Sequence, residues 1–284
     1  MKQYLDLLKN VLENGKLRED RTGVGTRSVF GRQVRFDLQK GFPLLTTKKM
    51  SIKSIIAELL WFIEGSTDER RLAEILFNKP RKDLINKKTI WTENANSEYW
   101  KSKANFEGDC GRIYGAQWRS WKNKNDETID QLKNVIDSIK KDPASRRHLV
   151  VAFNPGELNE MSLPPCHVMF QFYIENNKLS CMWSQRSVDI PLGLPYNIAS
   201  YAALTHLVAQ CCNLNVGELI GSLGDCHIYE NQIEGCMEQL IRKPTSLPSI
   251  ILNPDIKDIN DFKLSDIELV NYNSQGPIYF PFSV

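Results

Sequence analysis

The chain has 284 residues, of which 42% are hydrophobic and 25% are charged, proportions typical of a globular protein and not of a disordered one. Its formal net charge of +2 lacks the strong basic bias of a typical nucleic-acid-binding protein. The seven cysteines show no C-x-x-C spacing and the four histidines no metal-ligand spacing, so we expect a reduced, cytoplasmic protein without a disulfide framework or a metal site.

The N-terminal region predicts one helix followed by strands. Residues 2–14 place leucine and valine at helical spacing, which indicates an amphipathic helix rather than a signal peptide. Gly15 is expected to end this helix in the left-handed position that glycine favours. Residues 27–38 alternate in the manner of strands. No apolar run in the sequence is long enough to span a membrane.

A second helix is predicted over residues 52–63. Ser51 is suited to cap its start, and Gly65 lies just beyond its end. Glu58 falls at the edge of the apolar stripe, where a carboxylate either reaches solvent, finds a partner or has its pKa raised by burial.

The middle of the chain is less regular. Residues 66–110 are rich in lysine, asparagine and glutamate, and we expect a small helical lobe with loops there. Residues 128–141 carry apolar side chains, Ile129 among them, at the spacing of an amphipathic helix that Pro143 would stop. The apolar stretch from Leu149 to Phe153 predicts a strand.

A β-hairpin is predicted over residues 166–188. Alternating segments flank an Asn-Asn turn, and asparagine tolerates the positive φ angles that such turns require. This pairing would bring Cys166 close to Arg186, whose guanidinium favours the nucleophilic thiolate. Neighbouring residues on a strand point to opposite faces, so His167 is not expected to act as a base for Cys166.

A buried central helix is predicted over residues 198–212, which are apolar on almost every side. Asn197 precedes this helix and is suited either to cap it or to recognise a ligand. His227 and Tyr229 are two residues apart, so on a strand they share a face, where each is either a core residue or a group that binds a sugar hydroxyl. Residues 247–284 alternate as short strands and loops.

Three long motifs lie in the second half of the chain: Leu-Pro-Pro-Cys-His at 163–167, Gln-Arg-Ser-Val-Asp at 185–189 and Gly-Leu-Pro-Tyr-Asn-Ile-Ala-Ser at 193–200. Together they resemble the signature of the thymidylate synthase family, and the resemblance covers nearly the whole chain. It implies one α+β domain over 1–284, with a mixed twisted β-sheet, a long buried central helix and peripheral helices. It also implies a homodimer whose subunits share their active sites.

The resemblance further implies reductive methylation of dUMP to dTMP, with 5,10-methylenetetrahydrofolate as the donor of the one-carbon unit and the hydride. No metal, membrane or nucleic acid is required. The residues implied for catalysis are Cys166, Glu58, Tyr114, Arg186, Asn197 and Asp189. Those implied for nucleotide binding are Arg21, Gln185, Arg186, Ser187, Asn197, His227 and Tyr229, with Arg146 and Arg147 from the second subunit. Those implied for folate binding are Lys48, Ile90, Trp91, Leu163, Asp189, Leu192, Gly193, Tyr196 and Ser283.

The resemblance implies that Cys166 adds to the pyrimidine C6 and that Glu58 and Tyr114 transfer protons through ordered water. Departures from the family pattern lie on the folate side: Asn94 stands where many members have a second tryptophan, and Tyr279 where they have a lysine. They leave open a dUMP hydroxymethylase, in which water replaces the hydride. A non-catalytic nucleotide-binding or RNA-binding protein is the other alternative, which the presence of both Cys166 and Glu58 disfavours.

Overall fold

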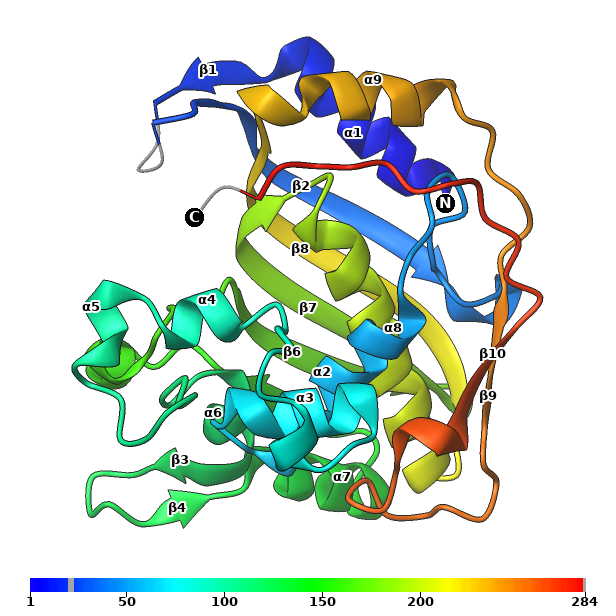
Figure 1. Cartoon of the computed structure of the whole chain (residues 1–284). Coiled ribbons are helices and arrows are strands. Elements are labelled where there is room, and N and C mark those ends of the chain that lie inside the picture. Colours follow the sequence, from blue (N-terminus) through cyan, green and yellow to red (C-terminus); the bar gives the residue numbers. More distant parts are fainter. Residues whose placement is uncertain (20–22, 283–284) are drawn as a thin grey trace.

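A twisted, mixed β-sheet forms the centre of the molecule (Figure 1) in the computed structural model, which describes residues 1–19 and 23–282. Within this described part, the main sheet has six strands in the order β1-β2-β8-β7-β6-β5. Neighbouring strands are antiparallel, except β7 and β8, which are parallel. The strands are β1 Lys16–Arg18, β2 Thr26–Asp37, β5 Leu149–Val151, β6 His167–Glu175, β7 Lys178–Asp189 and β8 Asn215–Tyr229. The predicted α+β class with a mixed sheet is confirmed.

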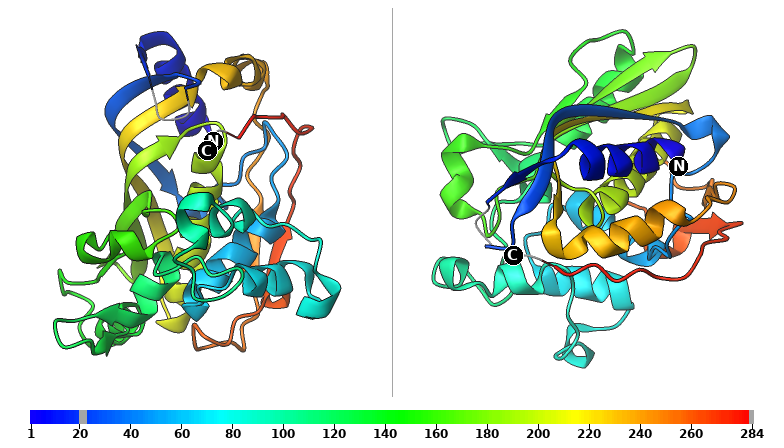
Figure 2. Two further views of the ribbon diagram at one scale, coloured as in Figure 1. Left: turned by 60° about the vertical axis from the view of Figure 1, so that its left-hand side comes forward. Right: turned by 90° about the horizontal axis from the view of Figure 1, so that it is seen from above.

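The helices gather mainly on one side of this sheet (Figure 2). Helix α8 connects the parallel strands β7 and β8, because parallel neighbours need a long crossover connection. Two small two-stranded sheets lie outside the main one, β3 Trp121–Lys122 with β4 Thr128–Ile129 and β9 Ser249–Leu252 with β10 Ile267–Val270. The helices are α1 Lys2–Asn14, α2 Ile52–Glu64, α3 Glu69–Phe77, α4 Thr92–Ala95, α5 Glu98–Lys101, α6 Tyr114–Ser120, α7 Gln131–Lys141, α8 Gly193–Cys211 and α9 Ile233–Ile241.

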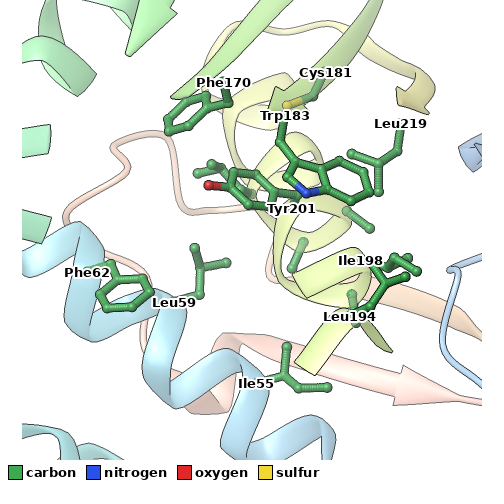
Figure 3. Packing of buried hydrophobic residues seen from close by; sticks show 14 of the residues in the cluster. Ile55, Leu59, Phe62, Phe170, Cys181, Trp183, Leu194, Ile198, Tyr201 and Leu219 are labelled. Atoms are coloured by element: carbon green, nitrogen blue, oxygen red, sulfur yellow. The ribbon is translucent and has the colours of Figure 1, made fainter. Parts of the chain in front are cut away.

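The core lies between the sheet, α8 and α2, where apolar side chains of all three meet (Figure 3). Trp183 of β7 stacks on Tyr201 of α8, with ring centroids 5.6 Å apart and planes 9° apart. Leu59 and Phe62 of α2 pack against the same cluster. Burying such side chains contributes on the order of 1.5–3 kcal/mol each, so this contact holds α2 and the sheet in a fixed relation.

Helix ends confirm one prediction and correct another. The Ser51 side chain caps α2 by accepting a hydrogen bond from the Ser54 backbone, and Gly65 ends it in the left-handed region at φ 71°. Helix α1 also ends at Gly15, but this residue is extended, with φ −66°. A Cβ there would lie 2.4 Å from the Val11 carbonyl oxygen. The glycine is therefore required by close packing and not by a left-handed backbone.

The predicted helix over 128–141 begins three residues later. Asp130 caps it by accepting a hydrogen bond from the Lys133 backbone at 2.9 Å, so the helix starts at Gln131. Ile129 instead belongs to β4 and is 39% exposed. The strand predicted to reach Phe153 ends at Val151, because the next two backbone N–H groups both donate to the Val168 carbonyl and break the ladder.

Helix α8 begins at Gly193, four residues before Asn197. Pro195 lies in its first turn, where a missing N–H leaves no helical hydrogen bond unmade. The interpretation of Asn197 as a helix cap is therefore wrong, and its side chain is available for another role. Among the described residues, neither α8 nor any other helix combines the length and the apolar character needed to cross a membrane.

Candidate active site

Cys166 lies immediately before β6, beside the strand that carries Arg186. The Arg186 backbone N–H donates to the Cys166 carbonyl at 2.8 Å, and His167 pairs with Gln185 across the hairpin. The Cys166 backbone N–H in turn donates to the Tyr114 hydroxyl at 2.7 Å. The predicted hairpin therefore brings the thiol to Arg186 as expected, and α6 supplies Tyr114 from a segment 52 residues away.

The charge state of the thiol differs from the sequence prediction. Burial raises the pKa of Cys166, and this effect outweighs the Arg186 guanidinium and the hydrogen bonds of Ser187 and Tyr114, which lower it. Arg186 is instead anchored by two 2.9 Å hydrogen bonds, from Nε to the Pro165 carbonyl and from Nη2 to the Pro164 carbonyl. A favoured thiolate in the protein alone was therefore a wrong expectation.

His167 is held away from the thiol chemistry, as predicted. Its Nδ1 lies 2.7 Å from the Tyr201 hydroxyl, and burial lowers its pKa to about 3. The imidazole is therefore neutral at ordinary pH. Its ring stacks on Tyr114 with centroids 4.1 Å apart, which fixes the tyrosine whose hydroxyl reaches Cys166.

Glu58 and Trp91 form a hydrogen-bonded pair in the candidate site. The indole Nε1–H of Trp91 donates to a Glu58 carboxylate oxygen at 2.7 Å. Burial raises the pKa of Glu58 to about 7, although the Trp91 hydrogen bond lowers it. The Trp91 ring also meets Tyr114 edge to face at 5.9 Å. A carboxyl group that titrates near neutrality beside a tyrosine can accept and return a proton.

The Asn197 amide is oriented by Gln185. The Gln185 Nε2 donates to the Asn197 side-chain oxygen at 3.1 Å and to the Ser187 carbonyl at 3.0 Å. Gln185 is itself fixed because Trp183 donates to its side-chain oxygen at 3.1 Å. With its oxygen engaged and no hydrogen bond from its amide nitrogen to the described part of the chain, Asn197 keeps both amide hydrogens for a ligand. Sequence reasoning placed Gln185 in the site but missed this orienting role, which no local pattern encodes.

His227 and Tyr229 share one face of β8, as their spacing predicted, with rings 5.4 Å apart. His227 Nδ1 lies 3.2 Å from the Asp225 carbonyl oxygen. The strand pairing sets Asp189 of β7 opposite His227, so the end of β7 and the end of β8 contribute to one region. Asp225 was not predicted, although its place two residues before His227 puts both on the same strand face.

Arg146 and Arg147 are predicted to serve the phosphate site of a second subunit, so their place in one subunit neither confirms nor contradicts that prediction. Arg146 and Arg147 are exposed, and within the described part of the chain their guanidinium groups make no recorded hydrogen bond or ion pair. Arg21 and Ser283, which were also predicted in the site, lie outside the described residues.

The predicted folate-binding residues Lys48 and Ile90 differ in exposure. Lys48 is only 4% exposed: its ammonium donates to the Pro191 carbonyl and lies 4.6 Å from the centre of the Phe280 ring. Burial lowers its pKa to about 8, although the nearby Asp189 carboxylate raises it. Ile90, in contrast, is 58% exposed and free to contact a ligand.

Asp189 supplies a carboxyl group among the other predicted folate-binding residues. Burial raises its pKa, while hydrogen bonds from the Leu192 backbone at 3.1 Å and from Gln232 lower it. Tyr196 is half-buried, and its pKa is raised by burial and by the nearby Glu58. Leu163, Leu192 and Gly193 are partly buried around them.

The comparison with known families gives one clear result. A family model described as thymidylate synthase matches residues 2–284. This range includes Cys166, Glu58, Trp91 and Asn197. Within the described residues, no group of three or more His, Cys, Asp or Glu side chains is arranged to hold a metal ion.

Proposed function

Because the chain belongs to the thymidylate synthase family, we propose that it catalyses the reductive methylation of dUMP to dTMP. When bound, 5,10-methylenetetrahydrofolate supplies the one-carbon unit and the hydride and leaves as dihydrofolate. The observation that carries the proposal is the grouping of Cys166 with Tyr114, Ser187 and Arg186 at the open end of the hairpin. This grouping supplies a nucleophile, hydroxyl donors and a cation at one point.

Cys166 is the proposed nucleophile. Its sulfur forms a bond to the pyrimidine C6, and the electrons of the C5–C6 double bond move toward O4, which makes C5 nucleophilic. Burial raises the thiol pKa in the free protein, so formation of the thiolate depends on the phosphate-facing Arg186 and on the hydroxyls of Ser187 and Tyr114, which each lower that pKa. Asn197 supplies an amide donor to the charge that develops on O4.

Glu58 and Tyr114 are proposed to move protons. A group is most effective in proton transfer when its pKa lies near the working pH, and the Glu58 pKa of about 7 meets this condition. The Trp91 hydrogen bond holds the carboxyl in one orientation. Removal of the C5 proton through ordered water is assigned to this pair.

The rest of the nucleotide is assigned to flanking strands. Arg186 and Ser187 of β7 bind the phosphate, together with Arg21, whereas His227 and Tyr229 of β8 bind the deoxyribose 3′-hydroxyl. Within the described residues, Arg186 uses two of its five N–H groups on the protein, which leaves three for phosphate oxygens. Arginine suits this task because its planar fork matches the spacing of phosphate oxygens.

The folate-facing residues fit a flat heteroaromatic ligand by their chemistry. Half-buried Tyr196 provides an aromatic face and the exposed Ile90 provides apolar contact, while Trp91, only 6% exposed, is proposed to lie behind the same wall. The buried carboxyl of Asp189 can pair with a ring N–H. Leu163, Leu192 and Gly193 complete the proposed wall, and Ser283 is proposed beside it. Lys48 is assigned to the conformation of this wall through Pro191, since its ammonium is buried there.

A homodimer with shared active sites is proposed from the uncovered face of the sheet. Along β7, buried Cys181 and Trp183 alternate with half-exposed Met182, and Tyr173 of β6 is 62% exposed on the face away from α8. A second copy of this face would bury these side chains by sheet-on-sheet packing. The exposed arginines of the partner subunit, at positions 146 and 147, would then complete the phosphate site. The seven cysteines, all free thiols, support a reducing, cytoplasmic location.

Mass analysis of the product tests the reaction. The protein is incubated with dUMP and 5,10-methylenetetrahydrofolate, and the nucleotide product is weighed. A methyl group on C5 together with release of dihydrofolate is the expected result. A product heavier than dTMP by one oxygen would assign a hydroxymethylase instead. If no modified nucleotide forms, both enzyme assignments are overturned.

A further inference from the structure

His227 faces two oxygen atoms of Asp225 through one of its ring nitrogens. Its Nδ1 lies 3.2 Å from the Asp225 backbone carbonyl oxygen and 3.5 Å from the carboxylate Oδ1. A carbonyl and a carboxylate only accept hydrogen bonds. In the neutral imidazole, Nδ1 must therefore carry the hydrogen, and Nε2 is left as an acceptor.

Asp225 is itself held in place by a residue of another strand, β1. Arg18 of β1 lies 3.2 Å from the carboxylate Oδ2, which leaves Oδ1 for the imidazole side. Oδ1 is buried, and no hydrogen bond to it is formed by any residue that the structure describes. Buried acceptors are normally satisfied, and the polar neighbour recorded for this one is His227 Nδ1. Arg18, Asp225 and His227 thus form one chain of polar contacts that ends at Nε2.

We propose that Asp225, held by Arg18, is a positioning residue that keeps His227 as a hydrogen-bond acceptor at Nε2, so that the site selects a ligand hydroxyl able to donate a hydrogen. This inference rests on the proposed function, in which that hydroxyl is the 3′-hydroxyl of dUMP. A 3′-fluoro analogue can accept but cannot donate. Bound at this site, the analogue offers no hydrogen-bond donor to the Nε2 lone pair. A site strongly rejects an analogue that leaves one of its polar groups unpaired.

The tautomer of His227 can be read directly by ¹⁵N NMR of histidine-labelled protein. The chain has only four histidines, so a His227→Gln variant identifies the relevant ring signals. The expected result in the wild type is a protonated Nδ1 and an unprotonated Nε2, with a mixture of tautomers in Asp225→Ala. A protonated Nε2 in the wild type would overturn the inference. An unchanged tautomer in Asp225→Ala would assign the role to the backbone carbonyl and remove it from the carboxylate.

Binding of two nucleotides tests the consequence for selectivity. The wild type should bind dUMP at least about tenfold more tightly than its 3′-fluoro analogue, which corresponds to ~1.4 kcal/mol. Asp225→Ala should reduce this preference severalfold by weakening dUMP, raising KM with little change in kcat. The matched control is Glu230→Ala, which removes a similarly exposed carboxylate that pairs with Arg27 at 2.9 Å but does not contact His227.

The possible outcomes distinguish a failure of the inference about Asp225 from a failure of the proposed function. Asp225→Ala could weaken the binding of dUMP and of the 3′-fluoro analogue equally, or Glu230→Ala could lose the preference for dUMP to the same extent. Either result would show that Asp225 acts only on the structure of β8. Failure of the wild type to bind dUMP would overturn the proposed function and the identity of the hydroxyl. The NMR measurement would even then decide whether Asp225 sets the tautomer of His227.

Discussion

Replacing Trp91 by phenylalanine should raise the pKa of Glu58 without moving the carboxyl group. In the structure, burial raises this pKa to about 7, and the Trp91 indole N–H at 2.7 Å opposes the rise by favouring the ionised form. A hydrogen bond to a charged group contributes about 1.5–3 kcal/mol. At 1.36 kcal/mol per unit, its loss would raise the pKa by about 1–2 units, to about 8–9.

The assay is the pH dependence of kcat/KM for dUMP. If Glu58 must be ionised to accept a proton, activity increases as pH rises through its pKa, so a higher pKa shifts this limb to higher pH. At pH 7 the ionised fraction would fall from about one half to between about a tenth and a hundredth, a loss of roughly 5-fold to 50-fold. Most of that loss should be recovered near pH 9, where the carboxyl of the variant ionises again.

Trp61→Phe provides a matched control for this measurement. Its indole is fully buried 5.8 Å from the Trp91 ring, but within the described structure its N–H has no hydrogen-bond partner. The control therefore loses a similar volume of packing and no hydrogen bond to Glu58, and its pH profile should keep its midpoint. A Trp91→Phe profile that drops in height with an unshifted midpoint would refute the role assigned to this hydrogen bond.

Three further results are expected. Cys166→Ala should abolish turnover while calorimetry still detects dUMP binding, whereas Cys181→Ala should remain active, because burial raises the pKa of Cys181 to about 12 and keeps it an inert core thiol. Mixing Cys166→Ala and Arg146→Glu subunits should restore up to about a quarter of wild-type activity through hybrid dimers; no recovery despite demonstrated subunit exchange would exclude shared sites. Asn197→Asp should shift the kcat/KM preference from dUMP toward dCMP by at least about tenfold, or ~1.4 kcal/mol, and an unchanged preference in competition assays would mean that the base is recognised elsewhere.

Local signals in the sequence predicted the elements that carry the site. Ser51 and Gly65 act at the ends of α2 as their types suggest. Asn176 and Asn177 form the hairpin turn with φ of 50° and 59°, which aligns Cys166 with β7 as the alternation required. Such features depend on residues that are near in sequence, so a single sequence contains the information.

Features that depend on distant contacts were not predictable in this way. The burial of Lys48 depends on Pro191, 143 residues away, and on the Phe280 ring, and neither contact leaves a periodic signal. The start of α8 was placed too late because Asn197 resembles a helix cap, whereas the helix already begins at Gly193 and tolerates Pro195 in its first turn. The pKa of Cys166 was given the wrong direction because sequence reveals the neighbouring arginine but not the desolvation that opposes it.

The strand order determines when the sheet can form during synthesis of the chain. The 12-residue strand β2 pairs with β8, so that Thr26 lies opposite Tyr229 and Asp37 opposite Glu218. At translation rates of about 5–20 residues per second, β8 is made on the order of 10–40 s after β2. During that interval β2 exposes an unpaired edge, and β7 does so once it has been made; such an edge is a template for aggregation. Folding should therefore be slow and largely post-translational, and a chain interrupted before Asn215 should require a chaperone to stay in solution and should show no activity.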